Sequence, residues 1–300
     1  MFEKFVENLI KDIKPGEKIK EIDLVLGGGA LNGLYMIGIL TYIKELERKD
    51  ILKVNKISGS SIGSLCGLLY FYDMLDYGTV MGDEVYKFYK LDHDLRCWNK
   101  LCDNLFDLLK KKHYIDLSNK LYINYTDLLE GKEIVKQQYN NLDDVKESIY
   151  RSSYIPIMID GNVLYKDRYI DGIFPFIFKD YCNAYHISLS SDISIIPNMF
   201  SIKDETTCAT RVFKGIIDAH GYFNDNTYSN LIYKLSDWNM YDFIIYRVTK
   251  IIITILIYIP IMLYKFYNIL PDNIKNSLPV NVIINNSIDI KNDFIKLFCT

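Results

Sequence analysis

The sequence has little histidine and no clustered cysteine, and both shortages limit the chemistry open to it. Four histidines and six cysteines occur in 300 residues. No two cysteines form a C-x-x-C pair, and none alternates with histidine at the spacing of a zinc site or a disulfide framework. We therefore expect no metal and no cofactor, and we expect most cysteines to be small buried apolar side chains.

An excess of charge of one sign is also missing. Lys and Arg number 35 and Asp and Glu 38, which gives a net charge of −3. Proteins that bind nucleic acid usually carry a basic face, so nucleic acid is not an expected partner. The N-terminus lacks a continuous apolar stretch followed by a small-residue cleavage site, and we expect a cytoplasmic protein.

No linker rich in Ser, Pro and Gly divides the chain, so we expect one main domain. Short apolar runs alternate with segments of helical periodicity. Strands are predicted at 22–26, 54–58, 121–125, 186–190 and 280–284, and helices at 3–14, 34–49 and 64–75. This alternation predicts an α/β fold in which the central strands are parallel.

A glycine-rich turn, Gly27 to Gly33, follows the first predicted strand and precedes a helix. Glycines permit positive φ and let backbone N–H groups face an anion, either a phosphate or an oxyanion. The turn lacks the third glycine of a dinucleotide fingerprint because position 32 is Asn, and Leu34 replaces the lysine of a Walker loop. An anion site and a plain tight connection are both open on this motif alone.

A second turn, Gly59-Ser60-Ser61-Ile62-Gly63, has the G-x-S-x-G pattern. In this pattern the serine lies on a sharp strand-to-helix elbow, and the flanking glycines relieve crowding around it. Among the neighbouring serines, only Ser61 has glycine two residues away on both sides. The pattern indicates Ser61 as a nucleophile, although the same glycines also suit close packing of a helix on a sheet.

A serine nucleophile needs a proton acceptor, and the sequence offers two kinds. His186 or His220 could complete a triad of the Ser, Asp, His order. Asp171 follows a short apolar segment and precedes Gly172, but an Asp-Gly pair is also a common turn. Asp171 is the favoured base only when it is considered together with the two glycine turns.

Three blocks, in this order, resemble the patatin-like phospholipase family. The first glycine turn and the apolar helix after it resemble the oxyanion segment, and Gly59 to Gly63 resembles the nucleophile elbow. The third block runs from Asp144 through Pro156 to Tyr169-Ile170-Asp171-Gly172 and resembles the aspartate–glycine motif. The resemblance covers about residues 22–190.

This resemblance implies a three-layer α/β/α fold and a Ser/Asp dyad. Ser61 would attack the ester carbonyl of a phospholipid or another ester lipid, and Asp171 would accept its proton. Backbone N–H groups of Gly28, Gly29 and Ala30 would hold the oxyanion. The catalytic domain would then span 21–200, after an N-terminal helix within 1–20 and before a helical C-terminal elaboration over 201–300.

The sequence departs from the family pattern at three positions, and two of them, Asn32 and the motif after Asp171, motivate an alternative. Ala30 replaces the third glycine, Asn32 replaces the usual arginine, and Ile173 replaces the second glycine after the aspartate. A catalytically weak patatin-like protein that binds lipid or serves as a membrane scaffold would tolerate such changes. A conventional esterase that uses His220 is a third hypothesis.

The C-terminal region contains the longest apolar run. Residues 251–264 carry no charge and are flanked by Lys250 and Lys265. As a helix the run would be about 21 Å long, shorter than the roughly 30 Å hydrocarbon core of a bilayer. We therefore predict a helix over 244–265 that lies on a membrane surface without spanning it, with a buried core helix as the alternative.

Overall fold

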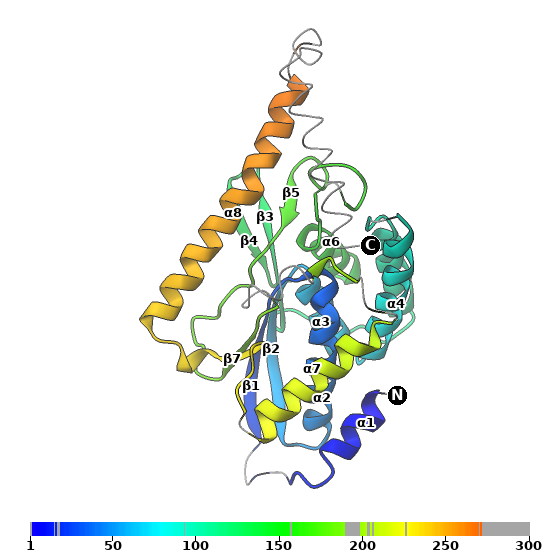
Figure 1. The fold of residues 1–300 in the computed structure, drawn as a ribbon, viewed down its shortest axis with the longest axis vertical. Helices are drawn as coiled ribbons and strands as arrows, with labels where there is room; N and C mark the ends of the chain where they lie inside the picture. Colours follow the sequence, from blue (N-terminus) through cyan, green and yellow to red (C-terminus); the bar gives the residue numbers. More distant parts are fainter. Residues whose placement is uncertain are drawn as a thin grey trace.

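The computed structural model describes residues 2–14, 16, 19–92, 94–156, 158–189, 199–202, 205, 207–225, 227–269 and 271. The predicted strand at 280–284 and His93 lie outside the described residues. Helices and strands alternate over the first 71 residues, as the sequence pattern predicts (Figure 1).

A seven-stranded mixed sheet forms the centre of the molecule (Figure 1). Its strands are β1 (Lys20–Leu26), β2 (Leu52–Ser60), β3 (Leu121–Asp127), β4 (Lys132–Lys136), β5 (Tyr169–Asp171), β6 (Ala184–Ile187) and β7 (Ile232–Lys234). They lie in the order β4-β3-β2-β1-β6-β7, and β5 pairs with β3. The inner strands β3, β2, β1 and β6 run parallel, whereas β4, β5 and β7 are antiparallel to their neighbours. The mostly parallel sheet is confirmed.

Strand β1 shows why the sheet has a cover on both faces. Leu24, Val25 and Leu26 are all fully buried, as in parallel strands that have layers on either side. Leu24 and Leu26 belong to the main core with the helices, whereas Val25 belongs to a smaller apolar cluster with Phe178 on the opposite face. Successive side chains of β1 therefore pack into two separate cores, one on each face of the sheet.

Helices pack into the main core on one side of the sheet (Figure 1). They are α1 (Phe2–Leu9), α2 (Gly33–Arg48), α3 (Ile62–Phe71), α4 (Leu75–Asp92), α5 (Cys97–Leu109), α6 (Leu142–Ser152) and α7 (Ala209–Asn224). Helices α2 and α7 cross closely, since a Cβ at Gly38 would lie 2.0 Å from the carbonyl oxygen of Val212. A helix from beyond residue 200 is thus part of the core.

The opposite face is covered by the segment that follows β5 and by the 3₁₀ turn Leu235–Asp237. Phe178 and Leu235 are buried there, and Phe176 stacks on Tyr122 with ring centroids 6.2 Å apart. With helices on one face and this cover plus the C-terminal helix on the other, the structure is consistent with the predicted three-layer α/β/α fold.

The C-terminal helix α8 (Met240–Ile269) runs along the side of the molecule (Figure 1). It contains the whole predicted helix over 244–265, which is therefore confirmed as a helix. Its inner side contacts the body at Lys250, whose Nζ lies 2.7 Å from the Glu133 carboxylate, and at Ile261, which packs against Ile170. Among the described helices, none combines the length and hydropathy that a membrane span requires.

Candidate active site

Ser61 lies on a sharp elbow between β2 and α3. Its φ is 51° and its ψ is −129°, a conformation that a non-glycine residue keeps only where its surroundings enforce it. The chain turns so tightly that a Cβ at Gly63 would lie 2.6 Å from the carbonyl oxygen of Leu26. A Cβ at Gly59 would lie 2.6 Å from the backbone of Gly63. The glycines of the G-x-S-x-G pattern therefore have a direct steric cause.

The register of β3 brings Asp171 to this elbow. Strand β2 pairs with β3 up to Ser60, which lies opposite Asn124. The next residue of β3, Tyr125, pairs with Asp171 at the end of β5. Along β3, the end of β2 before Ser61 and the end of β5 at Asp171 are therefore only one residue apart. The Ser61 side chain lies close enough to lower the pKa of the Asp171 carboxyl. Two residues far apart in the sequence meet here.

A serine at the end of α6 ties the elbow to the sheet. The Ser152 hydroxyl accepts the backbone N–H of Ser61 at 3.0 Å and donates to the carbonyl oxygen of Asn124 at 2.6 Å. The carbonyl oxygen of Ser152 accepts the backbone N–H of Gly172 at 3.4 Å. The side chain and the backbone of Ser152 therefore connect Ser61, β3 and the residue after Asp171. The sequence marked Ser152 only as part of a motif, and its bridging position emerges from the packing of α6.

The environment of Asp171 suits a proton acceptor. Burial raises the pKa of its carboxyl from 3.8 to about 7, although the nearby Ser61 side chain and the hydrogen bond from the backbone N–H of Ile173 both lower it. The Ile173 N–H lies 2.7 Å from Oδ1 and fixes the orientation of the carboxyl group. A carboxyl that titrates near neutral pH can both accept and return a proton at that pH.

The first glycine turn lies against Ser61. A Cβ at Gly28 would be 3.2 Å from the Cβ of Ser61, so the two turns are in contact. Ala30 opens a short 3₁₀ turn, Ala30–Asn32, that leads directly into α2. The Gly28, Gly29 and Ala30 segment is thus beside Ser61 and at a helix start, where N–H groups can stabilise an anion. Its role as oxyanion hole stays a prediction.

Two departures from the family pattern occur at strained backbone positions. Ala30 has a φ of 44° and Ile173 a φ of 58°, both in the left-handed region that favours glycine. For a β-branched residue such as Ile173, this conformation is a genuine outlier. Both residues keep the backbone path that glycine would take, at the cost of local strain.

The third departure, Asn32, has a buried cationic neighbour. The Asn32 side chain is fully buried, and its Oδ1 accepts a hydrogen bond of 2.9 Å from Nη1 of Arg211 on α7. Arg211 is also buried and forms an ion pair of 3.0 Å with Glu205. A guanidinium group thus lies behind the turn, although it comes from α7. Sequence reasoning missed Arg211, because no motif was recognised in that region.

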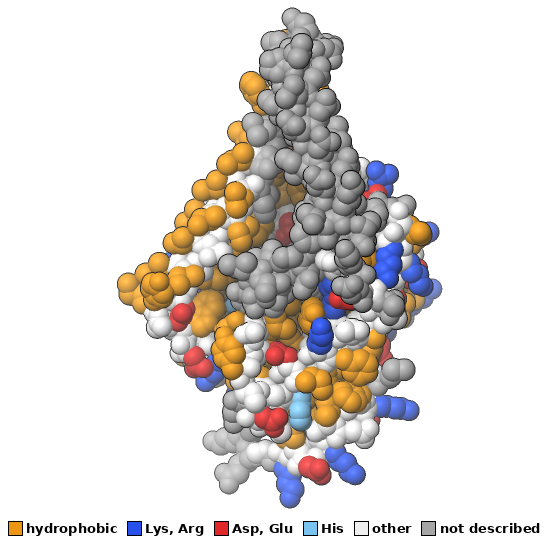
Figure 2. Space-filling model, viewed as in Figure 1, with side chains coloured by type: hydrophobic (Ala, Val, Ile, Leu, Met, Phe, Trp, Pro, Cys, Tyr) orange, Lys and Arg blue, Asp and Glu red, His pale blue; other side chains and the backbone are white. Residues whose placement is uncertain are grey.

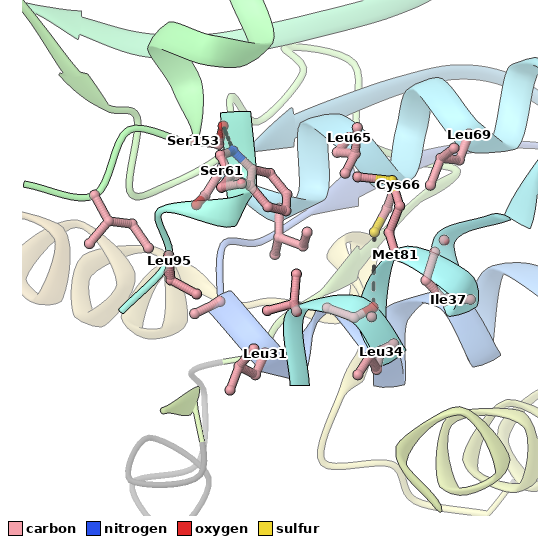
Figure 3. Close-up of a pocket in the computed structure, with 18 of the residues that line it drawn as sticks. Leu31, Leu34, Ile37, Ser61, Leu65, Cys66, Leu69, Met81, Leu95 and Ser153 are labelled. Carbon is pink, nitrogen blue, oxygen red and sulfur yellow. Dashed lines mark hydrogen bonds between the residues drawn. The ribbon is translucent and has the colours of Figure 1, made fainter. Parts of the chain in front are cut away.

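An apolar pocket opens beside Ser61 (Figure 3). Its walls are side chains of α2, α3 and α4, including Leu34, Leu65 and Met81, together with residues around the end of α6. At one end the indole N–H of Trp98 donates to the Ser153 hydroxyl at 3.1 Å. A lining this apolar next to Ser61 suits a hydrocarbon chain better than a polar group.

The histidines are placed elsewhere. Nδ1 of His220 lies 3.1 Å from the hydroxyl of Tyr42, within the α2–α7 contact. His186 lies on β6, and its ring packs against Trp238 and Tyr246 with centroids 5.5 and 5.7 Å away. Neither histidine hydrogen-bonds to Ser61 in the described part of the chain. Among all the residues that the structure describes, no group of three or more His, Cys, Asp or Glu is arranged to hold a metal ion.

Comparison with known proteins supports the resemblance to the patatin-like phospholipase family. A family model described as patatin-like phospholipase matches residues 24–79. The matched segment contains the glycine turn, α2, β2 and the Ser61 elbow, and it ends before Asp171. A search of curated proteins finds no match to the chain.

Proposed function

We propose, from the premise that the family match supports the patatin-like phospholipase family, that this chain is a lipid acyl hydrolase acting through an acyl-enzyme on Ser61. The family match suggests the general activity, hydrolysis of lipid esters. One observation supports the assignment of the dyad: the β3 register brings Asp171 near Ser61, and Ser61 lines an apolar pocket. We further propose carboxylic esters of phospholipids as substrates, cleaved in the manner of a phospholipase A.

The chemistry requires only residues of the chain and water. The Asp171 carboxylate takes the proton of the Ser61 hydroxyl as Oγ attacks the ester carbonyl carbon. N–H groups of the Gly28 to Ala30 turn stabilise the tetrahedral oxyanion, at about 3 kcal/mol for each donor by comparison with other hydrolases. Collapse breaks the bond to the alcohol oxygen, which receives the proton from Asp171. Water, deprotonated by the same carboxylate, then attacks the acyl-enzyme. The bond between the acyl carbon and Ser61 Oγ breaks, Oγ takes the proton back from Asp171, and the fatty acid is released.

The membrane surface is proposed as the place where this chain meets its substrate. Helix α8 exposes a continuous stripe of large apolar side chains, seen along the edge of the molecule in Figure 2. Members of the stripe are Tyr241, Ile244, Ile245, Val248, Ile251, Ile252, Ile255, Leu256, Ile259, Met262, Phe266 and Ile269. Their exposure is incompatible with the alternative of a buried core helix. An apolar helical face of this length favours an interface between water and lipid.

Labelling with a fluorophosphonate probe tests the nucleophile and its base. Wild type and His220→Ala should react, whereas Ser61→Ala should not react and Asp171→Asn should react far more slowly. Hydrolysis of phospholipid vesicles, followed by mass spectrometry of the released fatty acid, should show the same order and should survive EDTA. Labelling of Ser61→Ala at the wild-type rate would refute the nucleophile, and loss of activity in His220→Ala alone would favour the conventional esterase. Vesicle binding without labelling or hydrolysis would favour the scaffold alternative.

A further inference from the structure

A second cavity lies on the other side of the glycine turn from the apolar pocket. It has a volume of about 510 Å³ and is lined by Gly27 and Gly28 of the turn, by Ile173 after the catalytic aspartate, and by residues of β6, β7 and the start of α8. The apolar pocket instead touches the turn at Ala30. The turn that faces Ser61 therefore separates two cavities of different character.

The wall of this second cavity is aromatic. Trp238, Tyr246 and His186 pack against one another with ring centroids between 5.5 and 5.7 Å apart. Tyr222 and Tyr233 add further rings to the lining. The face of an aromatic ring carries partial negative charge and attracts a cation, most strongly one that is weakly hydrated. A cavity with several such rings favours a bulky organic cation.

His186 gives an independent sign that a ligand belongs here. Its side chain lines the cavity and is 4% exposed, yet Nδ1 has no hydrogen-bond partner in the described part of the molecule. Burial lowers the pKa of His186 to about 4, so the imidazole is neutral and can offer one donor and one acceptor. Unpaired buried polar atoms are uncommon in folded proteins, because they lose their bonds to water without replacement. Nδ1 itself is closed off from the cavity, so a ligand there would restore the missing bond once the imidazole ring turned toward it.

The charged residues of the lining fit a zwitterion. Asp237 and Asp242 supply two carboxylates, and Lys234 supplies one ammonium group. One oxygen of Asp242 accepts the N–H of Asn239 at 2.8 Å at the start of α8, so part of its charge stabilises the helix end. Two acids beside aromatic rings favour a cationic group, and the lysine can pair with a phosphate. An anionic head group without a cation would meet an unfavourable pair of carboxylates.

We infer that this cavity binds the phosphocholine type of head group, with the quaternary ammonium against the aromatic wall and the phosphate toward Lys234. This inference rests on the proposed function for the identity of the larger molecule, a phospholipid whose acyl chain fills the apolar pocket. Gly28 lines the cavity and also contacts Ser61. The ester bond of the phospholipid would therefore lie at Ser61, between the acyl chain in the apolar pocket and the head group in the second cavity. Ile245 and Tyr246 place one wall on α8, the helix with the exposed apolar stripe.

Trp238 provides a direct measure of binding. The chain has two tryptophans, Trp98 in the apolar pocket and Trp238 in the aromatic wall, so Trp98→Phe in a Ser61→Ala background leaves one reporter. Phosphocholine should change its fluorescence saturably. Phosphoethanolamine should bind about tenfold more weakly because its smaller, strongly hydrated ammonium gains less from the rings, and inorganic phosphate should cause no change in the same range. Equal responses to phosphocholine and phosphate, or no saturable response, would overturn the inference.

A matched pair of variants tests whether phosphocholine binds in this cavity. Tyr246→Leu removes a ring from the wall and should weaken phosphocholine binding about tenfold, whereas Tyr241→Leu, on the exposed side of the same helix, should leave it unchanged. Asp237 is exposed, so Asp237→Asn should keep the fold and still weaken binding several-fold. If neither Tyr246→Leu nor Asp237→Asn weakens binding, phosphocholine lies elsewhere and the assignment is wrong.

Two further comparisons distinguish a phospholipid head group from free phosphocholine, and failure of the proposed function from failure of the proposed cavity site. A short-chain lysophosphatidylcholine should bind more tightly than free phosphocholine, because its chain also enters the apolar pocket. Equal affinities would contradict a substrate head group and indicate a site for the free compound. Binding does not need Ser61, so phosphocholine binding without fluorophosphonate labelling would refute the proposed function alone. Labelling without phosphocholine binding would refute the cavity alone.

Discussion

The catalytic corner, comprising Ser61, Asp171, Ser152 and the turn at 27–30, and helix α8 are built on opposite principles. In the corner, side-chain and backbone polar groups are paired over long sequence distances, and Ser61 and Ala30 keep strained backbone conformations. Along α8, the outer face is apolar and exposed, with a few anchors such as Lys250 on the inner side. Chemistry needs atoms fixed in position, whereas contact with a fluid lipid surface needs only apolar area. Variants in the catalytic corner should therefore lower hydrolysis of soluble and vesicle substrates alike, whereas variants in α8 should lower only binding to vesicles and hydrolysis there.

The largest effect should follow from Asp171→Asn. An amide cannot accept the Ser61 proton, so turnover should fall about 10³- to 10⁴-fold on both a soluble short-chain ester and phospholipid vesicles. The exposed Asp180→Asn serves as control and should retain activity. Initial rates on the two substrates measure the effect. If Asp171→Asn lost activity on vesicles but not on the soluble ester, Asp171 would act in membrane binding and not in catalysis. The contrast between the two regions would then be wrong.

Wild-type activity on the soluble ester should rise with pH through about 7, because Asp171 acts as a base only after it loses its proton. The stability trend has the opposite sign. Since the folded-state pKa lies above the ordinary 3.8, the favourable contribution of the protonated carboxyl is complete below about pH 4 and is lost as pH rises through 7. Thermal melts between pH 5 and 8 should show a smaller decline for Asp171→Asn than for wild type. Parallel declines would mean that the pKa is not raised.

The next largest effect concerns α8. Changing Ile252, Ile255 and Ile259 to Ser removes three half-exposed apolar side chains from the stripe, each worth about 1 to 2 kcal/mol if lipid covers it. Partition to liposomes should fall about hundredfold or more, with soluble-ester turnover unchanged. The same change at Val80, Leu129 and Ile217, exposed apolar residues away from α8, is the matched control. Equal flotation of both triple variants would show that the stripe does not bind lipid.

A smaller effect should appear in acyl-chain preference. Met81 lines the apolar pocket, and its neighbour Val80 on the same helix is exposed. Met81→Trp should narrow the pocket and shift the ratio of rates toward short acyl chains several-fold, while Val80→Trp should leave that ratio unchanged. The ratio is the proper readout, because a general loss of stability lowers both rates together. An unchanged ratio in Met81→Trp would mean that the acyl chain lies outside this pocket.

The smallest effect tests strain in the corner. Ala30→Gly should raise the free energy of unfolding by about 0.5 to 1 kcal/mol, since relief of the positive φ exceeds the entropy that glycine loses on folding. Ala219→Gly, at a buried helical position of α7, should lower it by about 1 kcal/mol or more. Chemical denaturation of both variants makes the comparison. Destabilisation by Ala30→Gly would show that the alanine methyl group packs more favourably than its backbone is strained.

Much of the first half of the fold could be predicted from local pattern. The expected strands at 22–26 and 54–58 and helices at 34–49 and 64–75 correspond to β1, β2, α2 and α3 with small shifts at the ends. The N-terminal helix ends at Leu9, earlier than residue 14, and the strand expected at 186–190 lies at Ala184–Ile187. The short antiparallel strands β4, β5 and β7 were not predicted, since three to five residues carry too little periodicity to distinguish them from loops.

The sequence by itself determined the nucleophile elbow, because glycines two residues either side of Ser61 are a local steric requirement. It also determined the apolar helix near the C-terminus, because length and periodicity are local properties. Only the tertiary structure decided that Asp171 meets Ser61, since β5 exists by pairing with β3 where β2 has ended. It likewise placed Arg211 behind Asn32 and His186 in a second cavity. These contacts join elements distant along the chain, and no local pattern of residues encodes which strand or helix lies next to which.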